Sequence, residues 1–136
     1  MAIGHAKLEI MKKRVLIVED ELASRMLLEH LLSTKYQVTA LANGLEALNW
    51  LNQGNVADVV ITDIDMPYMS GIDLIYKMEE IPYHDQVPII VLSGSTPEEL
   101  ENLRNSGAVE AVLPKPFNLK TLQYNIIHSL KLDQVA

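Results

Sequence analysis

The sequence predicts an α/β fold, in which five parallel strands form a doubly wound sheet covered by five helices. Short apolar runs alternate with stretches whose leucines recur at helical spacing. The run at 58–67 is rich in β-branched residues without polar alternation, as is typical of a strand buried on both faces. The chain shows neither an internal repeat nor a linker-like stretch, so we expect one domain.

Five apolar runs account for the strands. The predicted strands cover residues 15–18, 36–41, 59–62, 88–92 and 111–113. Pro67 cannot continue a ladder of hydrogen bonds, so it marks the end of the third run. Pro114 also lacks an amide hydrogen, and we therefore expect the fifth strand to lie at an edge of the sheet.

A helix is predicted after each strand, from leucine spacing and from residues that begin or end helices. The first helix is predicted at 22–34 and the third at 72–80. The second is capped by Asn43 and ended by Gly54. The fourth is capped by Thr96, has proline in its first turn and is ended by Gly107, and the fifth is capped by Asn118. The side chains expected to face the core are Leu27, Leu28, Leu31 and Leu32; Leu45, Leu48, Trp50 and Leu51; Leu74, Ile75 and Met78; and Leu119, Leu122, Ile126, Ile127 and Leu130. We expect these helices on both faces of the sheet.

Composition excludes several classes of protein. The 136 residues are 49% hydrophobic, enough for one well-buried domain but not for two of ordinary size. Without cysteine, the chain has no disulfide, thiolate metal site or cysteine nucleophile. No apolar run approaches the roughly 18 residues that span a bilayer, so we expect a soluble protein that does not bind membranes. A net charge of −7 argues against nucleic-acid binding by this chain alone.

The first residues differ in composition from the rest of the chain. They lack the pattern of a secretory signal peptide, which points to the cytoplasm. Met11 is a second plausible start directly before the first strand. We therefore interpret residues 1–11 as a leader or a disordered extension, and residues 12–136 as the folded domain.

Charged and polar side chains follow four of the predicted strands. They are Glu19 and Asp20 after the first strand, Asp63 and Asp65 after the third, Ser93 after the fourth and Lys115 after the fifth. The carboxyl ends of parallel strands meet at one edge of a sheet, which is where ligands bind in open α/β folds. Considered alone, Glu19 and Asp20 would suit the N-terminus of a helix. Ser93 alone would suit a turn, and Lys115 alone would suit a solvent-exposed surface. Their joint occurrence favours a functional site.

Together, these side chains suit the binding of a metal ion and the transfer of a phosphoryl group. Several carboxylates around a small gap suit Mg²⁺, which prefers oxygen ligands, and the ammonium of Lys115 would neutralise part of their charge. A carboxylate can attack phosphorus to form an acyl phosphate when a metal, a hydroxyl and an ammonium share the charge of the transferred group. Ser93 would hydrogen-bond one phosphoryl oxygen, and Lys115 would hold another as a point charge.

The sequence resembles the receiver domains of two-component response regulators. The motifs that carry the resemblance are 15–21, 59–63 followed by Met66-Pro67 and Ser70-Gly71, 91–94 and 113–117, within a match that covers residues 13–132. The resemblance implies a flavodoxin-like sheet with strand order 2-1-3-4-5 and a cis peptide bond between Lys115 and Pro116. It also implies a phosphoacceptor signalling domain rather than an enzyme, although one that can assist its own phosphorylation and dephosphorylation.

The resemblance further implies a role for each site residue. Asp63 would accept a phosphoryl group from a phosphohistidine on a histidine kinase or a histidine phosphotransfer protein. Asp20 and Asp63 would bind Mg²⁺ directly, Glu19 through water, and Asp65 through its backbone carbonyl. The serine and the lysine would sense the phosphoryl group and switch the surface of the fourth helix, fifth strand and fifth helix toward a possible downstream effector protein.

Two positions depart from the common pattern of the family. Val112 stands three residues before the lysine, where many receivers carry an aromatic residue, so an aromatic switch is not available there. Asp65 places a second carboxylate two residues after the acceptor, where it could orient or deprotonate the water that removes the phosphoryl group. No output domain follows the last predicted helix, which leaves open a complete single-domain regulator or a part of a longer protein.

One alternative comes from a different class of protein. Asp63-Ile64-Asp65 matches the Asp-x-Asp motif of haloacid dehalogenase-type phosphohydrolases, which also use a later serine and lysine. Those enzymes place the motif after their first core strand and carry a cap domain, whereas here an acidic pair precedes the motif. A binding module that has lost phosphorylation is a third interpretation, weakened because the full set of acidic, serine and lysine residues is present.

Overall fold

The computed structural model describes residues 12–95 and 97–130. Its strands are β1 (Arg14–Val18), β2 (Gln37–Leu41), β3 (Val59–Asp63), β4 (Ile89–Ser93) and β5 (Ala111–Pro114). Its helices are α2 (Leu22–Leu32), α3 (Gly44–Asn52), α4 (Gly71–Met78), α5 (Glu98–Asn105) and α6 (Leu119–Ser129). The predicted leader at 1–11 and the predicted cap Thr96 lie outside the described residues. None of the described helices is long and apolar enough to cross a membrane.

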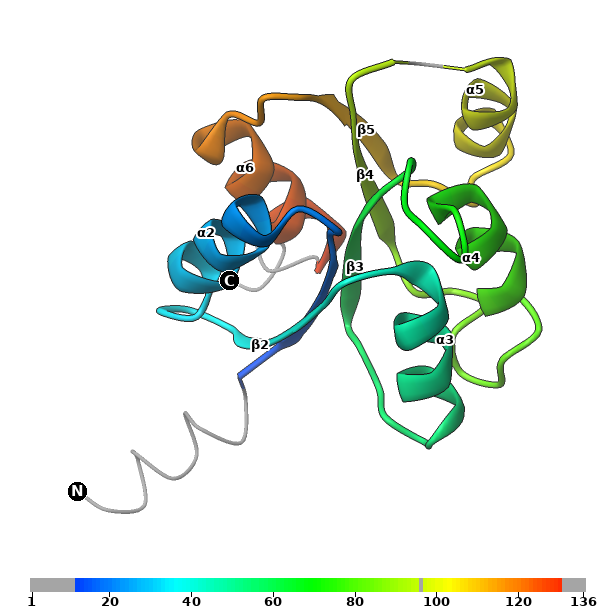
Figure 1. Ribbon diagram of the computed structural model, residues 1–136, viewed down its shortest axis with the longest axis horizontal. Coiled ribbons are helices and arrows are strands. Elements are labelled where there is room, and N and C mark those ends of the chain that lie inside the picture. Colours follow the sequence, from blue (N-terminus) through cyan, green and yellow to red (C-terminus); the bar gives the residue numbers. More distant parts are fainter. Residues whose placement is uncertain (1–11, 96, 131–136) are drawn as a thin grey trace.

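The strands form one five-stranded parallel sheet in the order β2-β1-β3-β4-β5, which confirms the predicted fold and strand order. β5 lies at an edge of the sheet, as Pro114 indicated. Figure 1 shows α2 and α6 on one face of the sheet and α3, α4 and α5 on the other. The sheet is therefore covered on both faces, with β3 at its centre.

β3 contributes side chains to the cores on both faces. Val60 packs with residues of α3, α4 and α5, whereas Val59 and Ile61 pack with residues of α2 and α6. Successive side chains of a strand point to opposite faces, so both faces must be apolar when both are covered. These three side chains are at most 1% exposed. The buried strand holds its carboxyl end, where Asp63 lies, in a fixed position.

Helix boundaries follow the residues that predicted them. The Oδ1 atoms of Asn43 and Asn118 each accept a hydrogen bond from the amide three residues later, at 2.9 and 3.1 Å, which confirms both caps. Gly54 and Gly107 adopt positive φ angles of 93° and 88° after α3 and α5, as expected for glycines that end helices. The peptide bond between Lys115 and Pro116 is cis, as the family resemblance implied.

Several details of the predicted helices were wrong. Pro97 is the N-cap residue of α5 rather than part of its first turn, because its ψ angle of 154° is extended. Leu27 and Leu45 remain 48% and 43% exposed, and Leu31, Leu119 and Ile127 are only half-buried. Leu48, Trp50 and Leu130 are also half-buried but pack against the core, as predicted. Each helix presents one narrow stripe to the sheet, so apolar residues beside that stripe stay in contact with water. The bounds of the other elements differ from prediction by one or two residues.

Gly71 brings the start of α4 against the end of β3. Its amide donates a hydrogen bond of 2.8 Å to the carbonyl oxygen of Ile64. A Cβ atom at this position would lie 2.1 Å from the carbonyl oxygen of Asp63, far inside van der Waals contact. Only glycine therefore allows the loop from 64 to 70 to close tightly behind Asp63.

Gly71→Ala should destabilise the protein by about 1–3 kcal/mol or more, because the added methyl group must displace main chain rather than a flexible side chain. Urea denaturation of both proteins measures the difference. Gly94→Ala is the matched control, since a Cβ at Gly94 would meet nothing within 4 Å. Equal urea midpoints for Gly71→Ala and the unsubstituted protein would contradict the close approach described above.

Candidate functional site

Four strands bring the candidate residues to one edge of the sheet. Glu19 directly follows β1, Asp63 ends β3, Ser93 ends β4, and Lys115 directly follows β5. The strand register places Ser93 opposite Pro114, one residue before the lysine. Because all four strands are parallel, their carboxyl ends lie side by side and the side chains gather there.

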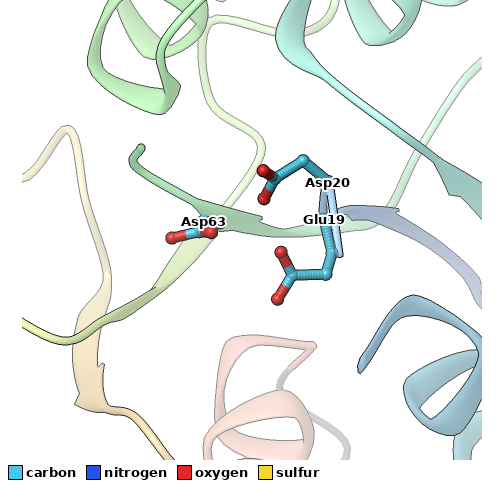
Figure 2. Close-up of side chains that lie close together, drawn as sticks. All are labelled: Glu19, Asp20 and Asp63. Atoms are coloured by element: carbon cyan, nitrogen blue, oxygen red, sulfur yellow. The ribbon is translucent and has the colours of Figure 1, made fainter. Parts of the chain in front are cut away.

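Three carboxylates form a cluster at this edge. One oxygen atom each from Glu19, Asp20 and Asp63 lies within 4.8 Å of the other two. Figure 2 shows the two acids of the β1–α2 loop facing Asp63 at the end of β3. Glu19 is buried, Asp63 half-buried and Asp20 exposed, so the cluster opens toward solvent on one side. The sequence prediction that these acids meet is confirmed.

Lys115 bridges two of the three acids. Its Nζ atom lies 2.9 Å from Oε1 of Glu19 and 2.8 Å from Oδ2 of Asp63. The side chain of Glu19 is only 3% exposed, and a buried carboxylate without a partner would be strongly destabilising. The ammonium therefore holds two strand ends together as well as balancing charge.

Burial and charge together set the ionisation of this pair. Burial raises the pKa of Glu19 above its ordinary value, the hydrogen bond from Lys115 opposes this rise, and the charge of Asp63 adds to it. Partial burial alone would lower the pKa of Lys115, but the hydrogen bonds and charges of Asp63 and Glu19 outweigh it and raise that pKa. The lysine is therefore a permanent cation at neutral pH.

Both carboxylate oxygens of Asp63 have defined partners. Oδ1 accepts a hydrogen bond of 2.7 Å from the amide of Ile64, and Oδ2 accepts one of 2.8 Å from Lys115. The hydroxyl of Thr62 donates to the carbonyl oxygen of Asp63 at 2.8 Å. The side chain is thus oriented by its own main chain on one side and by the lysine on the other.

Ser93 lies beside the cluster but its hydroxyl faces its own loop. Oγ donates a short hydrogen bond to the carbonyl oxygen of Ser95 and accepts one of 3.1 Å from the Ser95 amide. The main chain of Ser93 is tied to the lysine, since the Lys115 amide donates to the Ser93 carbonyl oxygen at 3.0 Å. The structure therefore brings the serine next to the acids without placing its hydroxyl on them.

Asp65 does not join the carboxylate cluster. Its side chain is exposed in the loop that leads from β3 toward α4. Among the residues that the structure describes, the group of acids that could hold a metal consists of Glu19, Asp20 and Asp63. A role for Asp65 would depend on its backbone carbonyl or on its position near the mouth of the site.

The sequence interpretation missed Arg25. Its Nη1 atom donates hydrogen bonds of 2.9 and 3.3 Å to the carbonyl oxygens of Glu19 and Asp20. A signal was present in the sequence, because a cation near the start of a helix opposes the helix dipole and so needs a local reason. The contact itself could not be read from spacing alone.

The donor set fits a hard divalent cation. The cluster supplies three carboxylates, and one ammonium lies against two of them, so negative charge is in excess. Mg²⁺ binds carboxylate and carbonyl oxygens and usually retains several waters, which the opening beside exposed Asp20 would admit. The site therefore combines metal-binding carboxylates with a fixed positive charge.

Comparisons with known proteins agree with this chemistry. The chain matches the family described as response regulator receiver domain over residues 15–127. It is 34% identical over 129 residues to the two-component response regulator ARR17 of Arabidopsis thaliana, covering 85% of this chain and 84% of that protein. It is 36% identical over 119 residues to the sensor histidine kinase TmoS of Ectopseudomonas mendocina, covering 88% of this chain but 12% of that protein. The chain spans 9–32% of the length of TmoS and three other curated relatives.

Solved structures share the fold. The response regulator TrrA from Thermotoga maritima, in complex with Mg(2+)-BeF, matches with a TM-score of 0.71 at 30% identity, covering 86% of this chain and 98% of that one. An adenylate cyclase structure from Rhodopirellula baltica matches with a TM-score of 0.80 at 27% identity, covering 89% of each chain.

The named relatives include response regulators and histidine kinases, which are signalling proteins. The family match includes Lys115 and all three acids of the carboxylate cluster. It favours signalling by phosphorelay over the phosphohydrolase alternative. The chain therefore belongs to the response regulator receiver domain family, the phosphorelay signalling domains of two-component systems.

Proposed function

We propose that the domain accepts a phosphoryl group onto Asp63 from a phosphohistidine of a histidine kinase or a histidine phosphotransfer protein. The observation that carries this proposal is the position of the Lys115 ammonium, which touches Asp63 and Glu19 beside the third acid. Family membership supports the same partner class, since the relatives include a sensor histidine kinase. We further propose that the protein acts in the cytoplasm.

The acids also have a role toward Mg²⁺. Asp20 and Asp63 would hold the cation directly, Glu19 would hold it through water, and Asp65 would contribute its backbone carbonyl. When bound, the cation would offset negative charge on the carboxylates and on the incoming phosphoryl group. The cluster of carboxylate oxygens supports this assignment, and so does the Mg(2+)-BeF complex of TrrA.

The chemistry of transfer falls to Asp63. A carboxylate oxygen attacks phosphorus, a bond from phosphorus to that oxygen forms, and the bond from phosphorus to the imidazole nitrogen of the donor breaks. The electron pair of the broken bond stays on the imidazole nitrogen, which takes up a proton from water as neutral imidazole leaves. The amide of Ile64 and the ammonium of Lys115 hold the attacking group in place, so little reorientation is needed. The domain acts as a phosphoacceptor that assists its own modification rather than as a turnover enzyme.

Ser93 supplies the response to phosphorylation. Its hydroxyl is bonded to the main chain of Ser95, so binding a phosphoryl oxygen requires it to leave that carbonyl. The released loop leads directly into α5, which allows the change to spread to the surface of α5, β5 and α6. Val112 in β5 is half-buried and carries no ring. We propose that a downstream effector protein reads this surface through apolar contacts.

Asp63→Asn should abolish phosphorylation by acetyl phosphate and Mg²⁺, because an amide cannot act as the nucleophile. Intact-mass spectrometry should show one added phosphoryl group on the unsubstituted protein and none on the variant. Asp85→Asn is the control, since Asp85 is an exposed acid that precedes β4, whereas the site lies at the other end of β4, where Ser93 is. Equal labelling of Asp63→Asn would refute the assignment of the acceptor.

Asp65→Asn should lengthen the lifetime of the phosphorylated state several-fold. A carboxylate near phosphorus can orient or deprotonate the attacking water, and general-base assistance contributes roughly 10²- to 10⁴-fold when geometry is good. The affinity for Mg²⁺ should change little, because the backbone carbonyl remains. Following dephosphorylation after donor removal tests this, and an unchanged or faster decay means that the side chain does not act on the water.

Beryllium fluoride with Mg²⁺ should change chemical shifts from Ser93 to Leu103 and around Val112, because the serine must leave its own loop to reach the ligand. Two-dimensional NMR of labelled protein measures this directly. Ser93→Ala should retain the changes at the acids but lose most of those in α5. Shifts confined to the carboxylate cluster in the unsubstituted protein would exclude a switch through α5.

A further inference from the structure

Arg25 ties α2 to the loop that carries two of the acids. Its Nη1 atom donates to the carbonyl oxygen of Glu19 at 2.9 Å and to that of Asp20 at 3.3 Å. These are main-chain contacts, whereas Lys115 reaches the carboxylate of Glu19 itself. Arg25 therefore holds the backbone of the loop, and Lys115 contacts the side chain of Glu19.

The usual devices that order the start of a helix are weak in α2. The N-cap residue Glu21 makes no side-chain capping hydrogen bond, and the first turn contains no acidic residue. The amide of Glu21 reaches Oε2 of Glu19 only at 3.4 Å, which is a long hydrogen bond. The Ser24 hydroxyl donates to Oε1 of Glu21 at 2.7 Å, but that bond joins two side chains and does not hold the loop backbone. Arg25 supplies two contacts to that backbone.

The position of this arginine also opposes local helix electrostatics. The start of a helix carries partial positive charge, so a cation near it is unfavourable. Arg25 is the fourth residue of α2, and its guanidinium donates to carbonyl oxygens of the preceding loop. Residues that break a local preference are expected at functional sites, where another interaction compensates.

Two effects of Arg25 on a bound divalent cation act in opposite directions. Its charge repels the cation, which would weaken binding. Its hydrogen bonds order the loop beforehand, so that binding does not bear the entropy of fixing that backbone. The guanidinium contacts the carbonyl oxygens of the loop rather than the carboxylates of the cluster. We take preorganisation as the larger effect, and the sign of the measured change in Mg²⁺ affinity tests this choice.

We propose that Arg25 is a positioning residue that preorganises the Glu19–Asp20 loop for the divalent cation. The proposal rests on the Mg²⁺ role of these acids under the proposed function and adds a residue outside the carboxylate cluster. Without the arginine, the bound Mg²⁺ itself must order the loop, so the affinity for Mg²⁺ falls. The phosphorylation rate at saturating Mg²⁺ changes less than twofold, because Asp63 and Lys115 keep their contacts.

Calorimetric titration of the metal-free protein with Mg²⁺ tests the proposal. Arg25→Gln should raise the dissociation constant about 5- to 30-fold, the factor that corresponds to ordering roughly one residue of backbone. Arg25→Lys should have a dissociation constant between those of the two proteins, because an ammonium on a flexible stem can still donate to main-chain carbonyls but lacks the rigid guanidinium plane that holds Nη1 near both. Hydrogen exchange at the amides of Asp20 and Glu21 should be faster in metal-free Arg25→Gln than in the unsubstituted protein.

Arg104→Gln is the matched control, because Arg104 pairs with Glu101 on the exposed side of α5. It should leave Mg²⁺ affinity and loop exchange unchanged. If Arg25→Gln binds Mg²⁺ as tightly as the unsubstituted protein, or more tightly, the positioning role is refuted while the proposed function stands. If the unsubstituted protein itself does not bind Mg²⁺, the proposed metal role fails, and the inference fails with it. Urea midpoints within error of each other show that the variants are folded.

Discussion

The ion pairs of Lys115 are the interaction on which the site depends. The lysine follows β5, yet its ammonium contacts acids at the ends of β1 and β3, which are 96 and 52 residues earlier in the chain. Glu19 is almost completely buried, so its charge requires this partner. The sheet must bring three strand ends together before the lysine can act. The site therefore depends directly on the fold. If the strands were not parallel, the carboxylates would not cluster and Lys115 would not neutralise them.

Around this interaction, Asp63 and Ser93 differ in which groups hold their side chains. Asp63 is fixed by the burial of β3, by the amide of Ile64 and by the close approach of Gly71 behind it. Ser93 sits on an equally buried strand, but its hydroxyl is bonded to its own loop rather than to the acids. A fixed carboxylate beside a hydroxyl that is bonded to its own loop is a suitable basis for the proposed two-state switch.

The sequence by itself determined the order of elements, the parallel sheet and the set of residues at its edge. These features follow from short-range patterns: β-branched runs without polar alternation, leucines at helical spacing, and capping residues such as Asn43 and Asn118. The position of the site also follows, because the carboxyl ends of parallel strands necessarily meet at one edge. Asp63 and its neighbouring acids could therefore be identified before any contact was known.

Only the tertiary structure decided which atoms meet. Lys115 shares its ammonium between two acids, the hydroxyl of Ser93 turns toward Ser95, and Arg25 reaches two carbonyls. Each of these contacts depends on the side-chain rotamer and on where the helices are placed. The exposure of Leu27 has the same origin, because the angle at which a helix crosses the sheet selects the stripe that is buried. Such choices depend on packing between segments distant in the chain, and the periodicity of a single segment carries no information about them.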